Sequence, residues 1–230
     1  MAFPHAGSSA TCFFPLSQAL CSDVDVLAIQ YPGRQDRRKE DNVEDLRTLA
    51  DLIVPEVLPY ADRRLALFGH GMGAIVAFEV AVRLAAAQVV PELLLVTGRR
   101  APSSIRDERV HSYSDAEFVR EVKGLGNTDQ RLFDDPPTLK MILPGLRSDY
   151  RAAELYRYRD TPRLECPVVA LIGEDDPMVT EEEALLWGTH TAVGLTLGVM
   201  SGDRFFNGDA EVTERLRAWA LGRRPALAAA

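Results

Sequence analysis

Short apolar runs alternate with helical patterns along most of this chain. Five runs bounded by turn-forming residues predict buried strands at 24–30, 65–68, 93–96, 168–172 and 195–199. Apolar residues at helical spacing predict helices at 43–58, 74–87, 182–187 and 212–220. Strands that alternate with helices favour an α/β fold, in which helices cover both faces of a mostly parallel sheet.

One region departs from this alternation. Residues 106–163 contain helical patterns, clearest at 115–124 and 146–158, but no convincing strand. The pair Pro136-Pro137 separates the two patterns. We therefore expect a core formed by residues 1–105 and 164–230, with residues 106–163 inserted as a helical lid.

Composition narrows the possible functions. The 230 residues carry a net charge of −8, which argues against general nucleic-acid binding. The start of the chain has no secretory signal, and no run reaches the roughly 18 apolar residues of a membrane span. The three cysteines lack the spacing of a metal site, so we expect a cytoplasmic protein without metal or cofactor.

Basic residues gather at two places, around Arg34 and at Arg99-Arg100. The simpler interpretation is solvated loop charge. The alternative is a docking patch for an acidic partner.

A glycine-rich turn follows the second predicted strand. Residues 69–74 read GHGMGA, the Gly-x-Ser-x-Gly pattern of a nucleophile elbow with Gly71 in place of serine. Gly69 and Gly73 would let the strand and the following helix cross closely, and glycine adopts the positive φ expected at position 71 at little cost. The turn also matches a dinucleotide-binding fingerprint. Glu92 lies at the wrong end of the next strand for that role, so nucleotide binding is disfavoured.

Several longer phrases carry a family resemblance. They are FPHAG at 3–7, QYPGR at 30–34, LFGHGMGA at 67–74, GRRAP at 98–102, LRSDYR at 146–151 and GEDDP at 173–177. With them, the chain resembles the type II thioesterases of polyketide and nonribosomal peptide biosynthesis. These are α/β-hydrolases that remove aberrant acyl groups from carrier proteins, so the resemblance implies an α/β-hydrolase fold.

The resemblance also implies roles for individual residues. The nucleophile falls on Gly71, the triad acid on Asp176, and the oxyanion-hole amides on Ala6 and Met72. The triad histidine falls on Arg204, in the phrase Gly-Asp-Arg-Phe-Phe. Nucleophile and base are therefore both missing, and arginine cannot act as the base because its pKa exceeds about 12. The family also has a strand before Phe3 that is absent here, so the edge of the sheet and the true start of the protein stay open.

Three functions follow from these departures. The first is an enzyme of altered, non-hydrolytic chemistry, such as cyclisation, elimination or decarboxylation of a biosynthetic intermediate. Its Ala6 and Met72 amides would polarise a carbonyl, and Arg204 would stabilise an enolate or carboxylate. Asp176 could pair with Arg204 or act as a base, and His5 and His70 are the candidates for proton transfer.

The second function is a catalytically inactive scaffold that binds acyl groups or a carrier protein. The third is residual thioester hydrolysis through another nucleophile: Ser8, Ser9, Cys12 or Ser201. In all three, the expected partner is a polyketide or peptide intermediate, free or bound to an acyl carrier protein.

Overall fold

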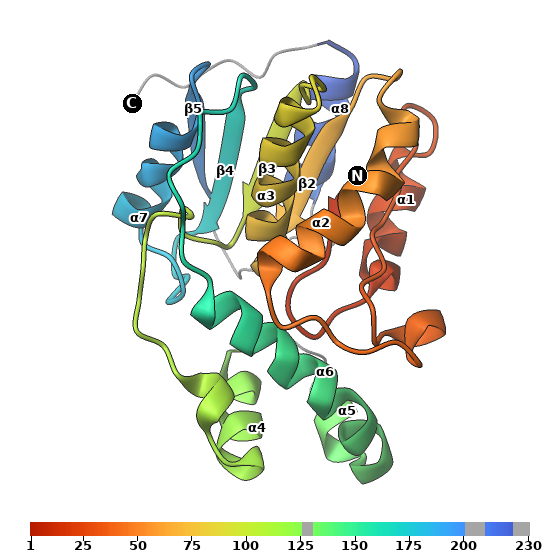
Figure 1. The fold of residues 1–230 in the computed structure, drawn as a ribbon, viewed down its shortest axis with the longest axis vertical. Helices are drawn as coiled ribbons and strands as arrows, with labels where there is room; N and C mark the ends of the chain where they lie inside the picture. The colour runs from red at the N-terminus through yellow and green to blue at the C-terminus, as the bar shows by residue number, and fades with distance from the viewer. Residues whose placement is uncertain (126–130, 201–209, 223–230) are drawn as a thin grey trace.

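A five-stranded parallel sheet forms the centre of the molecule (Figure 1). The computed structural model describes residues 1–125, 131–200 and 210–222. The strands lie side by side in chain order: β1 (Ala2–Phe3), β2 (Ala66–His70), β3 (Leu93–Thr97), β4 (Val168–Gly173) and β5 (Leu195–Met200). All neighbouring strands run parallel, as predicted, so their carboxyl ends share one edge of the sheet.

Helices cover both faces of this sheet. On one face lie α2 (Leu46–Val57) and α3 (Met72–Ala86), and on the other α1 (Phe14–Leu20) and α8 (Ala210–Ala220). Because successive strand residues face opposite sides, Leu67 of β2 joins the first core and Phe68 the second. The other helices of the core and its connections are short: α7 (Glu181–Leu185) and the 3₁₀ helices η1 (Ala10–Phe13), η2 (Gln35–Arg37), η3 (Leu58–Tyr60), η4 (Val110–Ser112) and η5 (Leu186–His190).

A separate group of helices lies beyond the carboxyl edge of the sheet (Figure 1). These insertion helices are α4 (Asp115–Gly124), α5 (Arg131–Asp134) and α6 (Pro136–Leu155). Ser114 and Glu117 form a capping box that starts α4. The insertion helices have a small core of their own, which comprises Phe118, Val122, Phe133 and Leu146.

The largest differences from the sequence prediction concern the strand expected at 24–30 and helices α1 and α6. The strand expected at 24–30 is wrong: only Ala28 bridges, to Ala2, because β1 offers just two residues at this edge of the sheet. Helix α1 was not predicted, since it is short and opens on Phe14-Pro15. Helix α6 starts at Pro136 rather than at residue 146, because proline is tolerated in a first helical turn and Asp135 caps it through the amide of Thr138.

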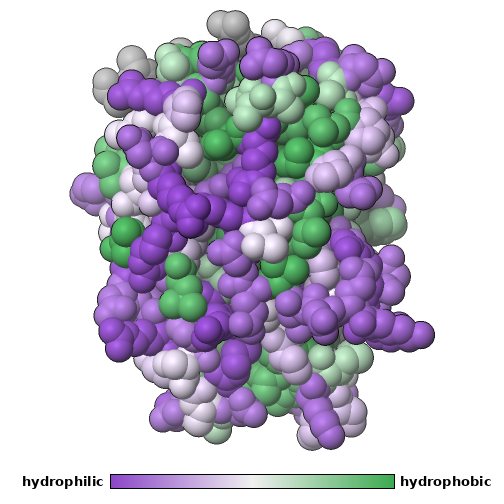
Figure 2. Space-filling model, in the orientation of Figure 1, coloured by the Kyte–Doolittle hydropathy of each residue, from purple (hydrophilic) through white to green (hydrophobic). Residues whose placement is uncertain are grey.

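Hydrophilic side chains predominate over the middle and lower parts of the face seen in Figure 2, whereas hydrophobic areas are most extensive in its upper part. Among the helices described, none combines the length and the apolar character that crossing a bilayer requires.

Candidate functional site

The turn between β2 and α3 keeps the backbone of an elbow. Gly71 has φ 53° and ψ −121°, a conformation in which side-chain-bearing residues are strained. Its amide donates to the carbonyl of Thr97 at 2.9 Å, and its carbonyl accepts from the amide of Ala74 at 3.0 Å. The turn is therefore fixed to β3 on one side and to α3 on the other.

The flanking glycines permit close packing of backbone on backbone. A Cβ on Gly69 would lie 2.4 Å from the carbonyl oxygen of Gly73, and one on Gly73 would lie 2.1 Å from that of Phe3. The predicted close crossing of strand and helix is confirmed. At Gly71 a Cβ would meet only His5, whose own Cβ would be 3.2 Å away, so a side chain nearly fits there.

A cavity of about 170 Å³ opens at this turn. Its floor comes from segments that follow β1, β2 and β3, including Ala6, Met72 and Arg99. Its roof comes from the insertion helices and the loop before them, including Val110 and Tyr150. The carboxyl edge of a parallel sheet is where open α/β folds bind ligands.

Four of the predicted site residues meet at this cavity: His5, Ala6, Gly71 and Met72. Met72 is the first residue of α3, so the helix itself leaves the Met72 amide without a partner. Such an amide at a helix N-terminus can polarise a carbonyl.

The remaining predicted residues are placed less centrally. Asp176 follows β4, is 8% exposed, and accepts a hydrogen bond from the amide of Met178 at 2.9 Å. Arg204 and Ser201 lie outside the described residues. Ser8, Ser9 and Cys12 are not among the described residues that line the cavity, and burial raises the pKa of the Cys12 thiol.

The two candidate proton-transfer histidines touch each other. The ring of His70 meets that of His5 edge-on, with 5.2 Å between centroids, and its Nδ1 is 2.7 Å from the Thr97 hydroxyl. Burial above all, and then the charge of His5, lowers the pKa of His70 to about 3. His70 is therefore neutral at physiological pH and too weak a base for catalysis there, because efficient bases titrate near the working pH.

The interpretation of the basic residues as solvated loop charge is wrong for two of them. Arg34 forms a 2.5 Å ion pair with buried Asp149 of α6. The other oxygen of Asp149 accepts from the amide of Gly7 at 2.7 Å, next to the predicted oxyanion residue Ala6. Arg100 is 3% exposed and pairs with Glu108. Both arginines hold the core against neighbouring segments rather than facing solvent.

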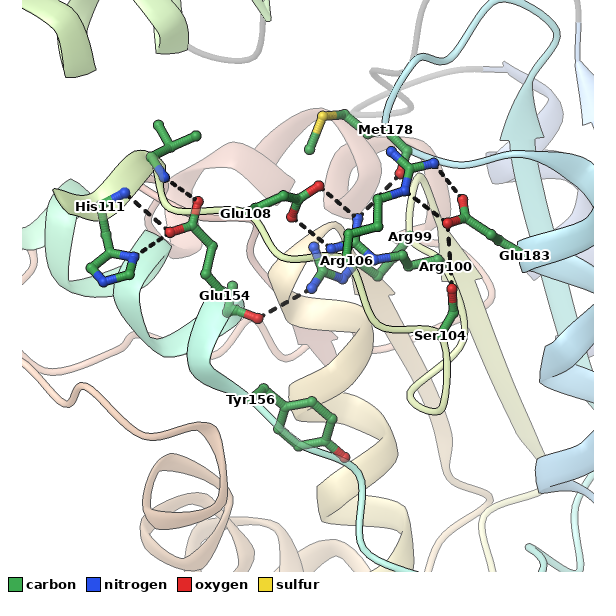
Figure 3. Close-up of polar contacts among 12 residues, drawn as sticks. Arg99, Arg100, Ser104, Arg106, Glu108, His111, Glu154, Tyr156, Met178 and Glu183 are labelled. Carbon is green, nitrogen blue, oxygen red and sulfur yellow. Dashed lines mark hydrogen bonds and ion pairs between the residues drawn. The ribbon is translucent and has the colours of Figure 1, made fainter. Parts of the chain in front are cut away.

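Sequence reasoning missed a group of charged residues around the roof of the cavity (Figure 3). Glu108 accepts from both terminal nitrogens of Arg100, at 3.1 and 2.6 Å. Glu154 accepts from the amides of Val110 and His111, both at 3.0 Å, and from the His111 ring. The sequence signal for this group was the pair Arg99-Arg100, because it directly follows a predicted parallel strand and so lies at the carboxyl edge of the sheet.

Known proteins are similar to this chain over most of its length. A family model described as thioesterase domain matches residues 1–220. A Streptomyces griseus protein named "Probable cadicidin biosynthesis thioesterase" is 47% identical over 204 residues, which cover 89% of this chain and 56% of that protein. The chain thus spans about half the length of this relative. Thioesterase PikA5 of Streptomyces venezuelae is 45% identical, with 90% of this chain and 74% of that protein covered.

Two solved thioesterase structures are also similar to this chain. The type II thioesterase BorB from the borrelidin biosynthetic cluster superposes with a TM-score of 0.88 at 45% identity, covering 96% of this chain and 91% of that one. RedJ, a thioesterase from the prodiginine pathway of Streptomyces coelicolor, superposes with a TM-score of 0.86 at 31% identity, covering 96% and 84%.

Proposed function

The chain belongs to the thioesterase family, as a type II thioesterase-like protein of polyketide and nonribosomal peptide systems. From this premise we propose that it acts on an acyl intermediate without forming an acyl-enzyme. The reaction would be a cyclisation, elimination or decarboxylation. The observation that carries the proposal is the turn at the cavity: it keeps the backbone of an elbow, but Gly71 has no hydroxyl that could attack an acyl group.

The binding half of the site supports this proposal. The acyl carbonyl would lie against the amides of Ala6 and Met72, since both residues line the cavity. Amides aimed at a developing oxyanion stabilise an enolate as well as a tetrahedral intermediate. The same two amides can therefore serve chemistry that needs no covalent bond to the protein. The insertion helices would act as a lid over the bound group.

The proton-transfer half favours His5 over His70. His5 lines the cavity and lies against Gly71, whereas the lowered pKa of His70 makes it a poor base. A covalent route would need both a nucleophile and a base beside it. Gly71 supplies no nucleophile, and arginine at position 204 could act only as a cation.

A second candidate function is binding without turnover. It is favoured by the loss of both proton-transfer partners of the triad, at Gly71 and Arg204. Such a protein would hold an acyl group or a loaded acyl carrier protein. Under either function we place it in the cytoplasm, a compartment that suits the free thiols of Cys12, Cys21 and Cys166.

The two functions separate in one experiment. The protein is incubated with a panel of acyl groups loaded on a carrier protein, and acyl group, carrier and protein are each weighed by intact mass spectrometry. We expect a change in the mass of the acyl group and no acyl adduct on the protein. An acyl adduct would contradict the proposal, and saturable binding without any change in the acyl group would establish the second function.

A further inference from the structure

Arg99 presents a cation to the cavity from a fixed backbone. It follows β3 directly, after Gly98, and lines the cavity together with Gly71 and Met72. Its carbonyl accepts a hydrogen bond from the indole of Trp187 at 3.0 Å, and that tryptophan is fully buried. The position of Arg99 at the cavity wall is therefore set by the core of the protein.

The carboxylates around Arg99 are bound to other groups (Figure 3). Glu108 pairs with Arg100, and Glu183 pairs with Arg106 at 2.6 Å. Glu154 accepts from two backbone amides and from His111. A further carboxylate at the cavity, that of Glu121 on α4, is exposed to solvent.

The guanidinium of Arg99 makes few hydrogen bonds of its own. Among the described residues, its side chain makes one hydrogen bond, from Nη2 to the carbonyl of Ala153 in α6 over 3.4 Å, and its buried Nε has no hydrogen-bond partner. Within residues 1–125, 131–200 and 210–222, no carboxylate forms an ion pair with it. A guanidinium whose Nε is buried without a hydrogen bond, and which has no counterion among these residues, is costly, so a site that keeps one is suited to an anion that arrives from outside.

We propose that Arg99 binds the free carboxylate of a carboxyacyl intermediate whose thioester carbonyl lies at the amides of Ala6 and Met72. This inference rests on the proposed function and names its substrate class. A guanidinium is the side chain best matched to a carboxylate, because its planar fork can donate two parallel hydrogen bonds. A neutral acyl chain would leave that fork unsatisfied.

The size of the cavity limits the length of the acyl group. A cavity of about 150 Å³ accommodates benzene, a molecule of six heavy atoms. The cavity here, about 170 Å³, is of that size. The intermediate is therefore a short diacid that is bound as a thioester through one of its two carboxyl groups. Its carbon chain has about three or four carbons, counting both carboxyl carbons.

The test compares two ligands that differ only in charge. They are the succinyl and succinamoyl amides of aminopantetheine, which keep the carbonyl and cannot be hydrolysed as thioesters. Binding of each to the full chain is measured by calorimetry at pH 7. We expect the succinyl compound to bind about tenfold or more tightly than the succinamoyl compound, as a charged hydrogen-bonded pair should.

Two variants assign the preference to the residue. Arg99→Met keeps much of the side-chain volume and should bind both ligands equally. Arg38→Met removes an exposed arginine that does not line the cavity and should leave the preference unchanged. If Arg99→Met does not fold, Arg99→Lys should retain part of the preference, and the wild-type comparison stands without either variant.

The outcomes separate this inference from the function on which it rests. Equal binding of both ligands by the wild type, or a preference that survives in Arg99→Met, would overturn the role of Arg99 and leave the proposed function in place. Failure of both ligands to bind would overturn this inference, whereas the proposed function is overturned by an acyl adduct on the protein.

Discussion

Gly71 is the residue whose replacement says most about the site. Its φ of 53° is unstrained only for glycine, and an added Cβ would meet the Cβ of His5 at 3.2 Å. We expect Gly71→Ser to lower the free energy of unfolding by about 1–2 kcal/mol in chemical denaturation. We also expect no fast thioester hydrolysis, because the hydroxyl would have no histidine at position 204 to accept its proton.

A matched control is available at Gly124. It ends α4 without a positive φ, and a Cβ there would meet nothing within 4 Å. Gly124→Ser should therefore change stability by less than about 0.5 kcal/mol. Rapid hydrolysis by Gly71→Ser would mean that another residue acts as the base.

His70 should make stability depend on pH. Its pKa is about 3 in the folded chain, against 6.5 for an ordinary histidine, chiefly because it is buried. Below pH 6.5 the unfolded chain takes up a proton that the folded chain does not, so stability is full above pH 6.5 and is lost as the pH falls toward 3. Between pH 7 and pH 5 this residue should account for about 2 kcal/mol of that loss.

Urea unfolding at the two pH values measures the effect. His70→Asn keeps a polar group beside Thr97 but does not titrate, so the pH dependence should shrink by that amount. Some dependence should remain from His190, because burial lowers its pKa to about 4. An undiminished dependence in His70→Asn would contradict the assignment.

Residue-scale prediction from sequence succeeded where a backbone motif dictates geometry. The elbow pattern placed Gly69, Gly71 and Gly73 correctly, because their roles depend on backbone conformation that only small residues allow. It could not single out Arg99. What distinguishes that residue is the absence of a carboxylate partner within the described residues, and this depends on segments far away in the chain.

At the scale of elements, Asp149 ties α6 to the core. It is 3% exposed and contacts both Arg34 and the amide of Gly7. Desolvation raises the pKa of this carboxyl, while Arg34 and the Gly7 amide oppose the rise. We expect Asp149→Asn to reduce the free energy of unfolding by about 3 kcal/mol, because it leaves the Arg34 charge buried without its counterion.

Asp115→Asn is the matched control on the same insertion helices. Asp115 also pairs with an arginine, Arg147, at 2.7 Å, but its side chain is 76% exposed. Its removal should cost less than about 1 kcal/mol. Similar losses in the two variants would show that Asp149 is no stronger a link than a surface ion pair. Thermal and urea unfolding followed by circular dichroism give both values.

Element prediction was most accurate where local signals and burial agree. Helix α4 has the bounds predicted from its helical pattern, Asp115–Gly124, and in the structure a capping box formed by Ser114 and Glu117 starts it. The strand expected at 24–30 failed because an apolar run forms a strand only where a neighbour offers matching backbone, and β1 offers two residues. Such pairing is a property of the sheet and not of the run.

At the scale of the whole molecule, the insertion helices should open before the core. Their own core comprises four buried residues, whereas α3 alone contributes eleven buried residues to the structure. We expect amides of α4 to exchange with deuterium more than about tenfold faster than those of α3 under native conditions, a difference of about 1.4 kcal/mol in opening. Equal protection would mean that the two parts unfold as one cooperative unit.

The contact of Asp149 with Gly7 has a thermodynamic consequence at this largest scale. One carboxylate is shared by the loop that carries Ala6 and by a helix of the cavity roof. If a ligand binds more tightly when the Ala6 loop is held in place, linkage makes the effect reciprocal. Binding of the ligand then stabilises the docked position of α6 by the same free energy by which docked α6 strengthens binding. Occupancy of the cavity could then be recorded as slowed amide exchange in α6, with no product formed.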